Sequence, residues 1–133
     1  MLTRLIHVLG DYVGTLPEDV LVSLGRLVCE AEADRLLYLR LAAMASRGES
    51  TSGAAPMNKL SGSELAQRVA QWAADVLGAD TLYPSEAGDK SPALAGDIEE
   101  FLRTSTVLTI MGGTSQVQRN TAAGRALGLP REK

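Results

Sequence analysis

The sequence predicts an all-α protein, an up-down four-helix bundle with a short final helix after a Gly-Gly break. Apolar residues recur at helical spacing in four long segments, which are bounded by glycine, proline or hydroxyl residues. The 133 residues suit one domain with its own core. Hydrophobic residues make up 45% of the chain and aromatic residues only 4%, so we expect a core of Leu, Val and Ala, which favours packed helices over a sheet.

The first helix is predicted over about residues 2–14. Its apolar face would be formed by Leu2, Leu5, Ile6, Leu9 and Val13. Met1 lies almost inside this pattern, so the sequence is expected either to begin within a longer helix or to have an unusually late start. His7 lies in this segment without a second metal-ligating residue at helical spacing, and we interpret it as a partly exposed helix residue.

The second helix is predicted to begin near Thr15 and to end at Ser46, before Gly48. Thr15 and Glu18 form a capping-box pattern around a proline that the first turn of a helix tolerates. Residues 36–43 are apolar on almost every side, so part of this segment is expected to contact another domain or subunit. Cys29 is expected to be a small buried side chain rather than a reactive thiol.

The third helix is predicted to begin at Pro56, or at Ser61 through a second capping box with Glu64, and to end at Gly78. Trp72 lies on the same stripe as the core residues of this helix, so we interpret it as a packing residue. After a loop over about residues 81–90, Ser91 and Pro92 are predicted to start the fourth helix.

The fourth helix carries the neighbouring carboxylates Glu99 and Glu100, which we interpret as a solvated face rather than an acid–base pair. This helix is expected to end at Met111, where two glycines follow, and Thr114 or Ser115 would cap the final helix to about Leu127. Paired glycines let another group approach the backbone closely. A helix N-terminus has unpaired N–H donors, so this corner suits an anionic or electron-rich ligand.

The segment around the two glycines, Ile-Met-Gly-Gly-Thr-Ser-Gln-Val-Gln-Arg-Asn over residues 110–120, strongly resembles the end of the acyl-CoA dehydrogenase family. Residues 125–131 resemble the tail that often follows, and Arg103 stands where the family usually has an arginine. Residues 55–60 resemble the start of the family's third bundle helix. The resemblance covers residues 1–133 as a single domain of the kind found at the C-terminal end of family members, truncated at its own N-terminal end.

The resemblance implies an FAD-dependent oxidoreductase of fatty acid or lipid metabolism that dehydrogenates an acyl-CoA thioester between its α and β carbons. Thr114, Ser115 and Gln116 would contact the flavin, and Gly113 would approach the acyl-CoA. No catalytic residue is identified, because Gly112 occupies the position of the base in many relatives. We expect the 133-residue chain alone to be inactive, and to need further domains or a partner subunit.

The resemblance also implies a homo-oligomer, or a hetero-oligomer with a related subunit. Asp75 replaces a family glutamine that contacts a neighbour's flavin, and Ala79 replaces the second glycine of a pair. An aspartate near a pyrophosphate would repel it, which disfavours flavin binding at that end of the helix. A non-catalytic helical interaction module that keeps only the scaffold is the alternative function.

Charge and composition disfavour several other functions. The net charge is −3 and the isoelectric point is about 5.1, so a nucleic-acid partner is not expected. Cys29 is the single cysteine, which rules out an internal disulfide. The sequence has no Glu-x-x-His pair for a metal–carboxylate bundle and no apolar run long enough to span a membrane. Without a visible secretory signal, the protein is expected to be cytoplasmic.

Overall fold

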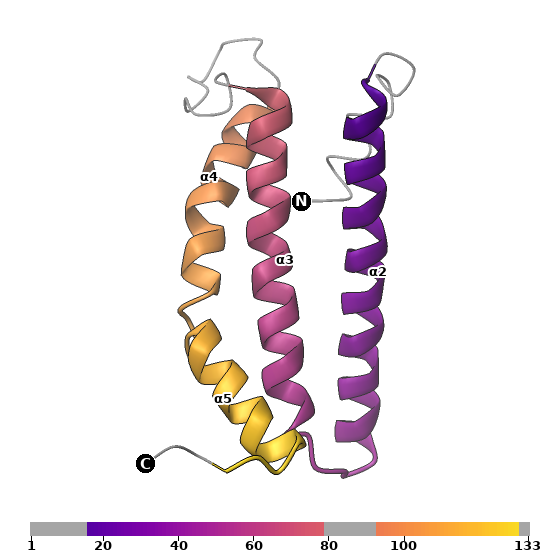
Figure 1. Cartoon of the computed structure of the whole chain (residues 1–133), viewed down its shortest axis with the longest axis vertical. Coiled ribbons are helices and arrows are strands. Elements are labelled where there is room, and N and C mark those ends of the chain that lie inside the picture. Colours follow the sequence, from indigo (N-terminus) through magenta and orange to yellow (C-terminus); the bar gives the residue numbers. More distant parts are fainter. Residues whose placement is uncertain (1–15, 79–92, 131–133) are drawn as a thin grey trace.

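The computed structural model describes residues 16–78 and 93–130 of the chain (Figure 1). These residues form four α-helices and no strand, which confirms the all-α prediction. The helices are α2 (Glu18–Ser46), α3 (Ala54–Leu77), α4 (Ala93–Leu108) and α5 (Ser115–Ala126). The predicted helix over residues 2–14, with His7, lies outside the described residues.

The helices are arranged up and down (Figure 1). α2 and α3 run antiparallel and are joined by a short loop, and α4 and α5 follow each other in the direction opposite to α3. The extensive contacts among the described helices all involve α3, which packs against α2, α4 and α5. α4 and α5 therefore act as one arm of the bundle that is interrupted between Leu108 and Ser115.

The predicted end of α2 at Ser46 is confirmed, whereas Thr15 of the predicted capping box lies outside the described residues. Pro17 occupies the N-cap position, and no side-chain cap hydrogen bond is made there among the described residues. The carbonyl of Pro17 instead accepts a hydrogen bond from the N–H of Leu21 at 3.1 Å. Glu18 and Asp19 place negative charge in the first turn, where it interacts favourably with the helix dipole.

α3 begins at Ala54, two residues before Pro56, and Ser61 lies inside the helix. The predicted start at Ser61 is therefore wrong, and the start at Pro56 is late by two residues. Proline is the third residue of the helix, where the backbone N–H that it lacks would have no intrahelical partner. The predicted end is confirmed, because Gly78 follows the last turn with a φ of +74°.

The core lies between α2, α3 and α4. Its buried residues are Leu27, Leu65, Val69, Ala73 and Ile98. Trp72 packs against this cluster, as predicted, and its indole N–H donates a hydrogen bond to Ser23 Oγ on α2 at 2.8 Å. The expected small, largely aliphatic core is present in the described residues.

Cys29 is exposed, so its expected burial is wrong. The buried residues Leu24 and Leu27 of α2 lie near one line along the helix, three residues apart. A residue two positions after Leu27 is turned by about 200° around the helix axis and faces away from α3. No helix in the described parts of the chain has the length and apolar character needed to cross a membrane.

Candidate functional site at the Gly-Gly corner

The break between α4 and α5 is formed by two consecutive glycines in the left-handed region. The φ angle is +69° at Gly112 and +99° at Gly113, values that residues with a Cβ rarely adopt. The predicted glycine break is therefore confirmed. α4 ends at Leu108 rather than at Met111, because residues 109–111 are wound into a turn in which the N–H of Met111 donates to the carbonyl of Val107 at 2.9 Å.

Thr114 is the N-cap of α5. The sequence predicts either Thr114 or Ser115 at this position. Its backbone is extended, and its Oγ1 accepts a hydrogen bond from the N–H of Val117 at 3.3 Å. The N–H of Ser115 donates back to the carbonyl of Thr109 at 3.2 Å, which closes the corner on itself. α5 ends at Ala126, one residue before the predicted limit.

Side chains from α3 and α5 hold the corner in place. Lys59 Nζ donates to the carbonyl of Gly113 at 2.7 Å, and Gln118 Nε2 donates to the carbonyl of Gly112 at 2.6 Å. Arg119 Nη2 donates to Glu64 Oε1 at 2.5 Å and so ties α5 to α3. Sequence reasoning missed the Lys59 contact, because its partner lies 54 residues further along the chain and no local pattern signals such a pair.

The outer side of the corner combines apolar side chains with polar groups. Ile110, Met111 and Val117 are more than half exposed. Thr114 and Gln116 are exposed, and Ser115 is half-buried. The structure therefore brings the predicted flavin-contacting residues together at one exposed helix N-terminus.

The backbone of the corner also has unused donors. Within the described residues, no hydrogen bond uses the backbone N–H of Gly112, Gly113 or Thr114. These three amides are consecutive and lie beside the exposed apolar side chains. Such a surface can bind a ligand that carries electron-rich oxygens on an apolar body.

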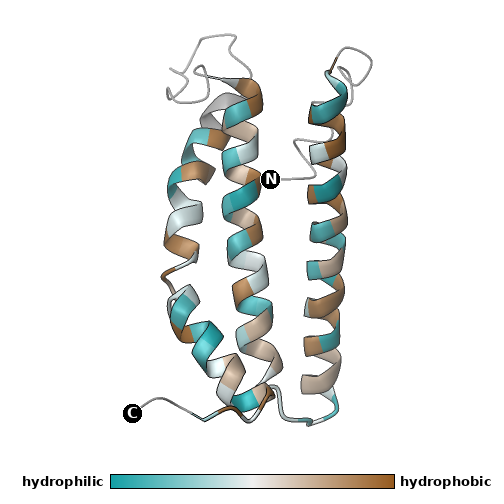
Figure 2. Cartoon of the chain, viewed as in Figure 1, coloured by the Kyte–Doolittle hydropathy of each residue, from teal (hydrophilic) through white to brown (hydrophobic). Residues whose placement is uncertain are grey.

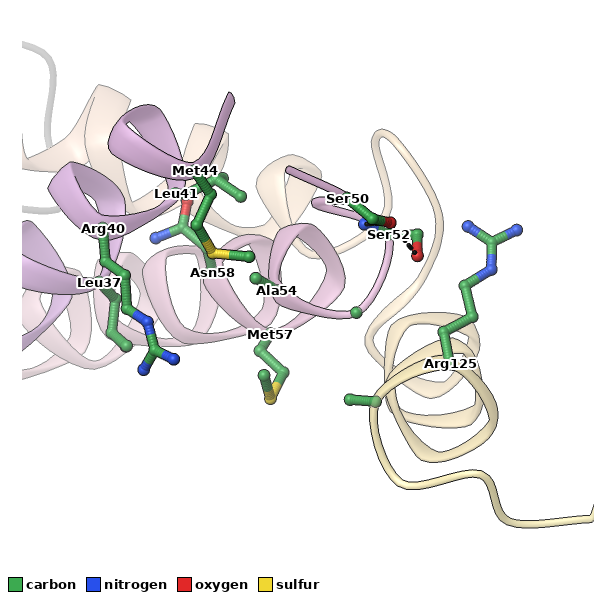
Figure 3. A pocket seen from close by; sticks show the side chains of 12 residues that line it. Leu37, Arg40, Leu41, Met44, Ser50, Ser52, Ala54, Met57, Asn58 and Arg125 are labelled. Carbon is green, nitrogen blue, oxygen red and sulfur yellow. Dashed lines mark hydrogen bonds between the residues drawn. The ribbon is translucent and has the colours of Figure 1, made fainter. Parts of the chain in front are cut away.

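A second exposed region lies on the C-terminal half of α2, where Figure 2 shows hydrophobic residues recurring along the helix. Its large side chains Leu36, Leu37, Tyr38 and Leu39 are between 41% and 61% exposed. A hollow of about 380 Å³ adjoins it (Figure 3). Arg40 and Arg125 lie at the two ends of this hollow, with Met44 and Met57 between them.

The remaining candidate positions do not form a site in the described residues. Asp75 is exposed and accepts a hydrogen bond from Gln71 Nε2 at 2.9 Å, and Ala79 lies outside the described residues. Glu99 pairs with Arg103 at 2.5 Å, four residues on, while Glu100 is exposed. No group of three or more potential metal ligands is found in the part of the chain that the structure describes.

A family model and two curated relatives match this chain, and all of them are acyl-CoA dehydrogenases. The model of the acyl-CoA dehydrogenase C-terminal domain matches residues 18–127. Two curated relatives come from Mycobacterium tuberculosis: acyl-CoA dehydrogenase FadE34 is 34% identical over 129 residues, and acyl-CoA dehydrogenase FadE26 is 36% identical over 119 residues. The matches cover 96% and 86% of this chain, but only 16% and 29% of those relatives.

Two solved structures share the fold. One is the Tcur3481-Tcur3483 steroid acyl-CoA dehydrogenase, with a TM-score of 0.85 and 27% identity over 98% of this chain and 34% of that one. The other is the ChsE4-ChsE5 complex from Mycobacterium tuberculosis, with a TM-score of 0.74 and 33% identity over 88% of this chain and 29% of that one. Each of these two structures is named as a pair of components.

Proposed function

Because the chain belongs to the acyl-CoA dehydrogenase family as a C-terminal helical domain, we propose that it forms one wall of a flavin and acyl-CoA site. The reaction is the α,β-dehydrogenation of an acyl-CoA thioester. In it, a base would remove the α-proton, and a hydride would leave the β-carbon. FAD, when bound, supplies the acceptor for that hydride. The rest of the site comes from other domains or from a related subunit.

The observation that carries this proposal is the Gly-Gly corner. Its three N–H groups, which have no partner among the described residues, and the hydroxyl of Ser115 offer hydrogen bonds to oxygen-rich parts of a ligand. The exposed side chains of Ile110, Met111 and Val117 supply apolar surface for a flavin ring or an acyl chain. In this assignment Thr114, Ser115 and Gln116 contact FAD, while Gly113 allows the acyl-CoA to approach the backbone.

The corner supplies no base for the α-proton. Gly112 has no side chain, and the nearby carboxylate of Glu64 is engaged by Arg119. A proton acceptor must lie within hydrogen-bond reach of the proton that it removes. We therefore assign the base to another part of the complete enzyme, and we assign to this chain the roles of binding and orienting the ligands.

We propose that the working form is an oligomer. It is either a homo-oligomer or a hetero-oligomer with a related subunit. The exposed apolar side chains of residues 36–39 form a surface that such a subunit would cover. Both solved relatives are named as a pair of components, which favours the hetero-oligomer. A steroid-linked acyl-CoA is the first substrate class to test, because one of those relatives is named as a steroid enzyme. We also propose a cytoplasmic location, because a chain with a single cysteine has no internal disulfide of the kind common in secreted domains.

The experiment is co-expression of this chain with a longer acyl-CoA dehydrogenase-like subunit, followed by purification through a tag on this chain. We expect the 133-residue chain alone to be colourless. The co-purified complex should carry flavin absorbance and turn over an acyl-CoA in a dye-coupled assay. A complex that forms but contains no flavin and shows no turnover would favour the non-catalytic interaction module. Flavin retained by the chain alone would contradict the partner requirement.

A further inference from the structure

We propose that Lys59 is a positioning residue that anchors the Gly-Gly corner to α3 and aims the backbone N–H of Thr114 toward the ligand, which deepens the function proposed above and rests on it. Lys59 belongs to α3, whereas the corner joins α4 to α5. Its half-buried side chain reaches across the bundle, and its Nζ donates to the carbonyl of Gly113 at 2.7 Å. No carboxylate pairs with Lys59 among the described residues, so this carbonyl is its hydrogen-bond partner there.

The first step of the inference is the geometry of the peptide bond. The peptide bonds of the corner are trans. In a trans peptide, the C=O and the following N–H point in opposite directions. Because Lys59 draws the carbonyl of Gly113 toward α3, the N–H of Thr114 points away from α3. Gln118 acts in the same way one residue earlier, since its bond to the carbonyl of Gly112 turns the N–H of Gly113 away from Gln118.

The second step concerns what holds these orientations. Two glycines with positive φ can occupy many backbone conformations, so the corner has little intrinsic preference of its own. Gln118 lies in the first turns of α5 and moves together with the corner. Lys59, unlike Gln118, ties the corner to a separate and continuous helix, α3. A charged donor also makes a stronger hydrogen bond to a carbonyl than a neutral donor does.

The consequence for function is a division of roles. Thr114 and the two glycines present the donors, and Lys59 sets the direction of the Thr114 N–H without touching the ligand. Its ammonium group also contributes positive charge beneath the donors, which favours an electron-rich oxygen on the outer side. Loss of Lys59 should therefore weaken ligand binding more than it weakens the fold.

The first arm of the test uses the 133-residue chain itself. Lys59→Met removes the charged donor and keeps a long apolar side chain, while Arg68→Met on the same helix is the matched control, because Arg68 pairs with Glu30 on α2. We expect Lys59→Met to raise amide hydrogen exchange of residues 115–118 about tenfold or more and to shift the Thr114 amide resonance. Arg68→Met should leave both unchanged. Equal exchange and unshifted resonances in Lys59→Met would overturn the proposal.

The second arm uses the complex with the longer subunit. We expect Lys59→Met to assemble normally but to raise the KM for acyl-CoA, or to lower flavin occupancy, by about tenfold, and Lys59→Arg to restore part of this loss. If the variant and wild-type complexes have the same KM for acyl-CoA and the same flavin occupancy, the positioning role is overturned and the proposed function still stands. A wild-type complex without flavin would instead overturn the proposed function, while the exchange measurement would still decide whether Lys59 orders the corner.

Discussion

Trp72 on α3 and Ser23 on α2 are joined by a hydrogen bond from the indole N–H to the serine Oγ at 2.8 Å. The same Oγ donates to the carbonyl of Val20 at 2.8 Å. The pair is partly buried beside the core cluster, so the only tryptophan of the chain reports directly on the α2–α3 interface.

We predict that Ser23→Ala lowers the free energy of unfolding by about 1–2 kcal/mol, because the indole N–H loses its partner in a partly buried place. Urea denaturation followed by Trp72 fluorescence measures this change. Ser46→Ala is the matched control, because the hydroxyl of Ser46 is exposed and donates to the carbonyl of Ala43 within the same helix. A loss as small as that of the control would show that the cross-helix bond contributes nothing.

The two glycines of the corner should tolerate alanine unequally. A Cβ at Gly113 would lie 2.8 Å from Gln118 Nε2, whereas a Cβ at Gly112 would have nothing within 4 Å. Both substitutions strain a positive φ, so we expect Gly112→Ala to cost about 1 kcal/mol and Gly113→Ala about 2–3 kcal/mol. Thermal melts compare the two variants. Adding Gln118→Ala to Gly113→Ala should recover part of the difference, and a larger loss in Gly112→Ala would contradict this order.

The exposed part of α2 should govern assembly. Leu36 is 53% exposed and Leu39 is 48% exposed, so replacing both with glutamate should leave the fold intact. We expect the double variant to weaken self-association, or binding to a related subunit, at least about tenfold, because charges would have to be buried in the contact. Light scattering over a range of concentrations measures it. Val22→Glu, at a position 50% exposed nearer the start of α2, is the control and should associate like the wild type.

The pair formed by Glu32 and Arg35 gives a prediction for pH. Arg35 Nη2 lies 2.6 Å from Glu32 Oε1, and this hydrogen bond lowers the pKa of the Glu32 carboxyl below its ordinary value. A lowered folded-state pKa stabilises the protein above the ordinary pKa, and the contribution is lost as the pH falls through the folded pKa. An NMR titration should show Glu32 titrating at lower pH in the wild type than in Arg35→Gln. Coincident titration curves would show that the pair does not form in solution.

Local features of this fold could be predicted from the sequence. The end of α2 at Ser46, the end of α3 just before Gly78 and the break at the two glycines each depend on residues within one turn of the position concerned. The Thr114 cap is of the same kind, since its hydroxyl bonds to an amide three residues away. Such signals are short-range and can be recognised without tertiary information.

Features that depend on other helices could not be predicted in the same way. Glu64 was one half of an expected capping box, but it pairs instead with Arg119, 55 residues away. The prediction that Cys29 is buried was wrong because α2 presents one narrow face to α3. Composition does not reveal how many neighbouring helices a helix has. Lys59 was missed for the same reason, because its role depends on where the corner lies against α3.

The position of α3 has a consequence for how the bundle opens. Since α2 and α5 each dock mainly on α3, either one can detach while the other stays bound, and the described bundle need not unfold all at once. Protection against solvent exchange should then be deepest in α3 and shallower in its two flanking helices. The corner is carried by one of these flanking helices, so the energy needed to rearrange it locally is smaller than the energy needed to unfold the domain.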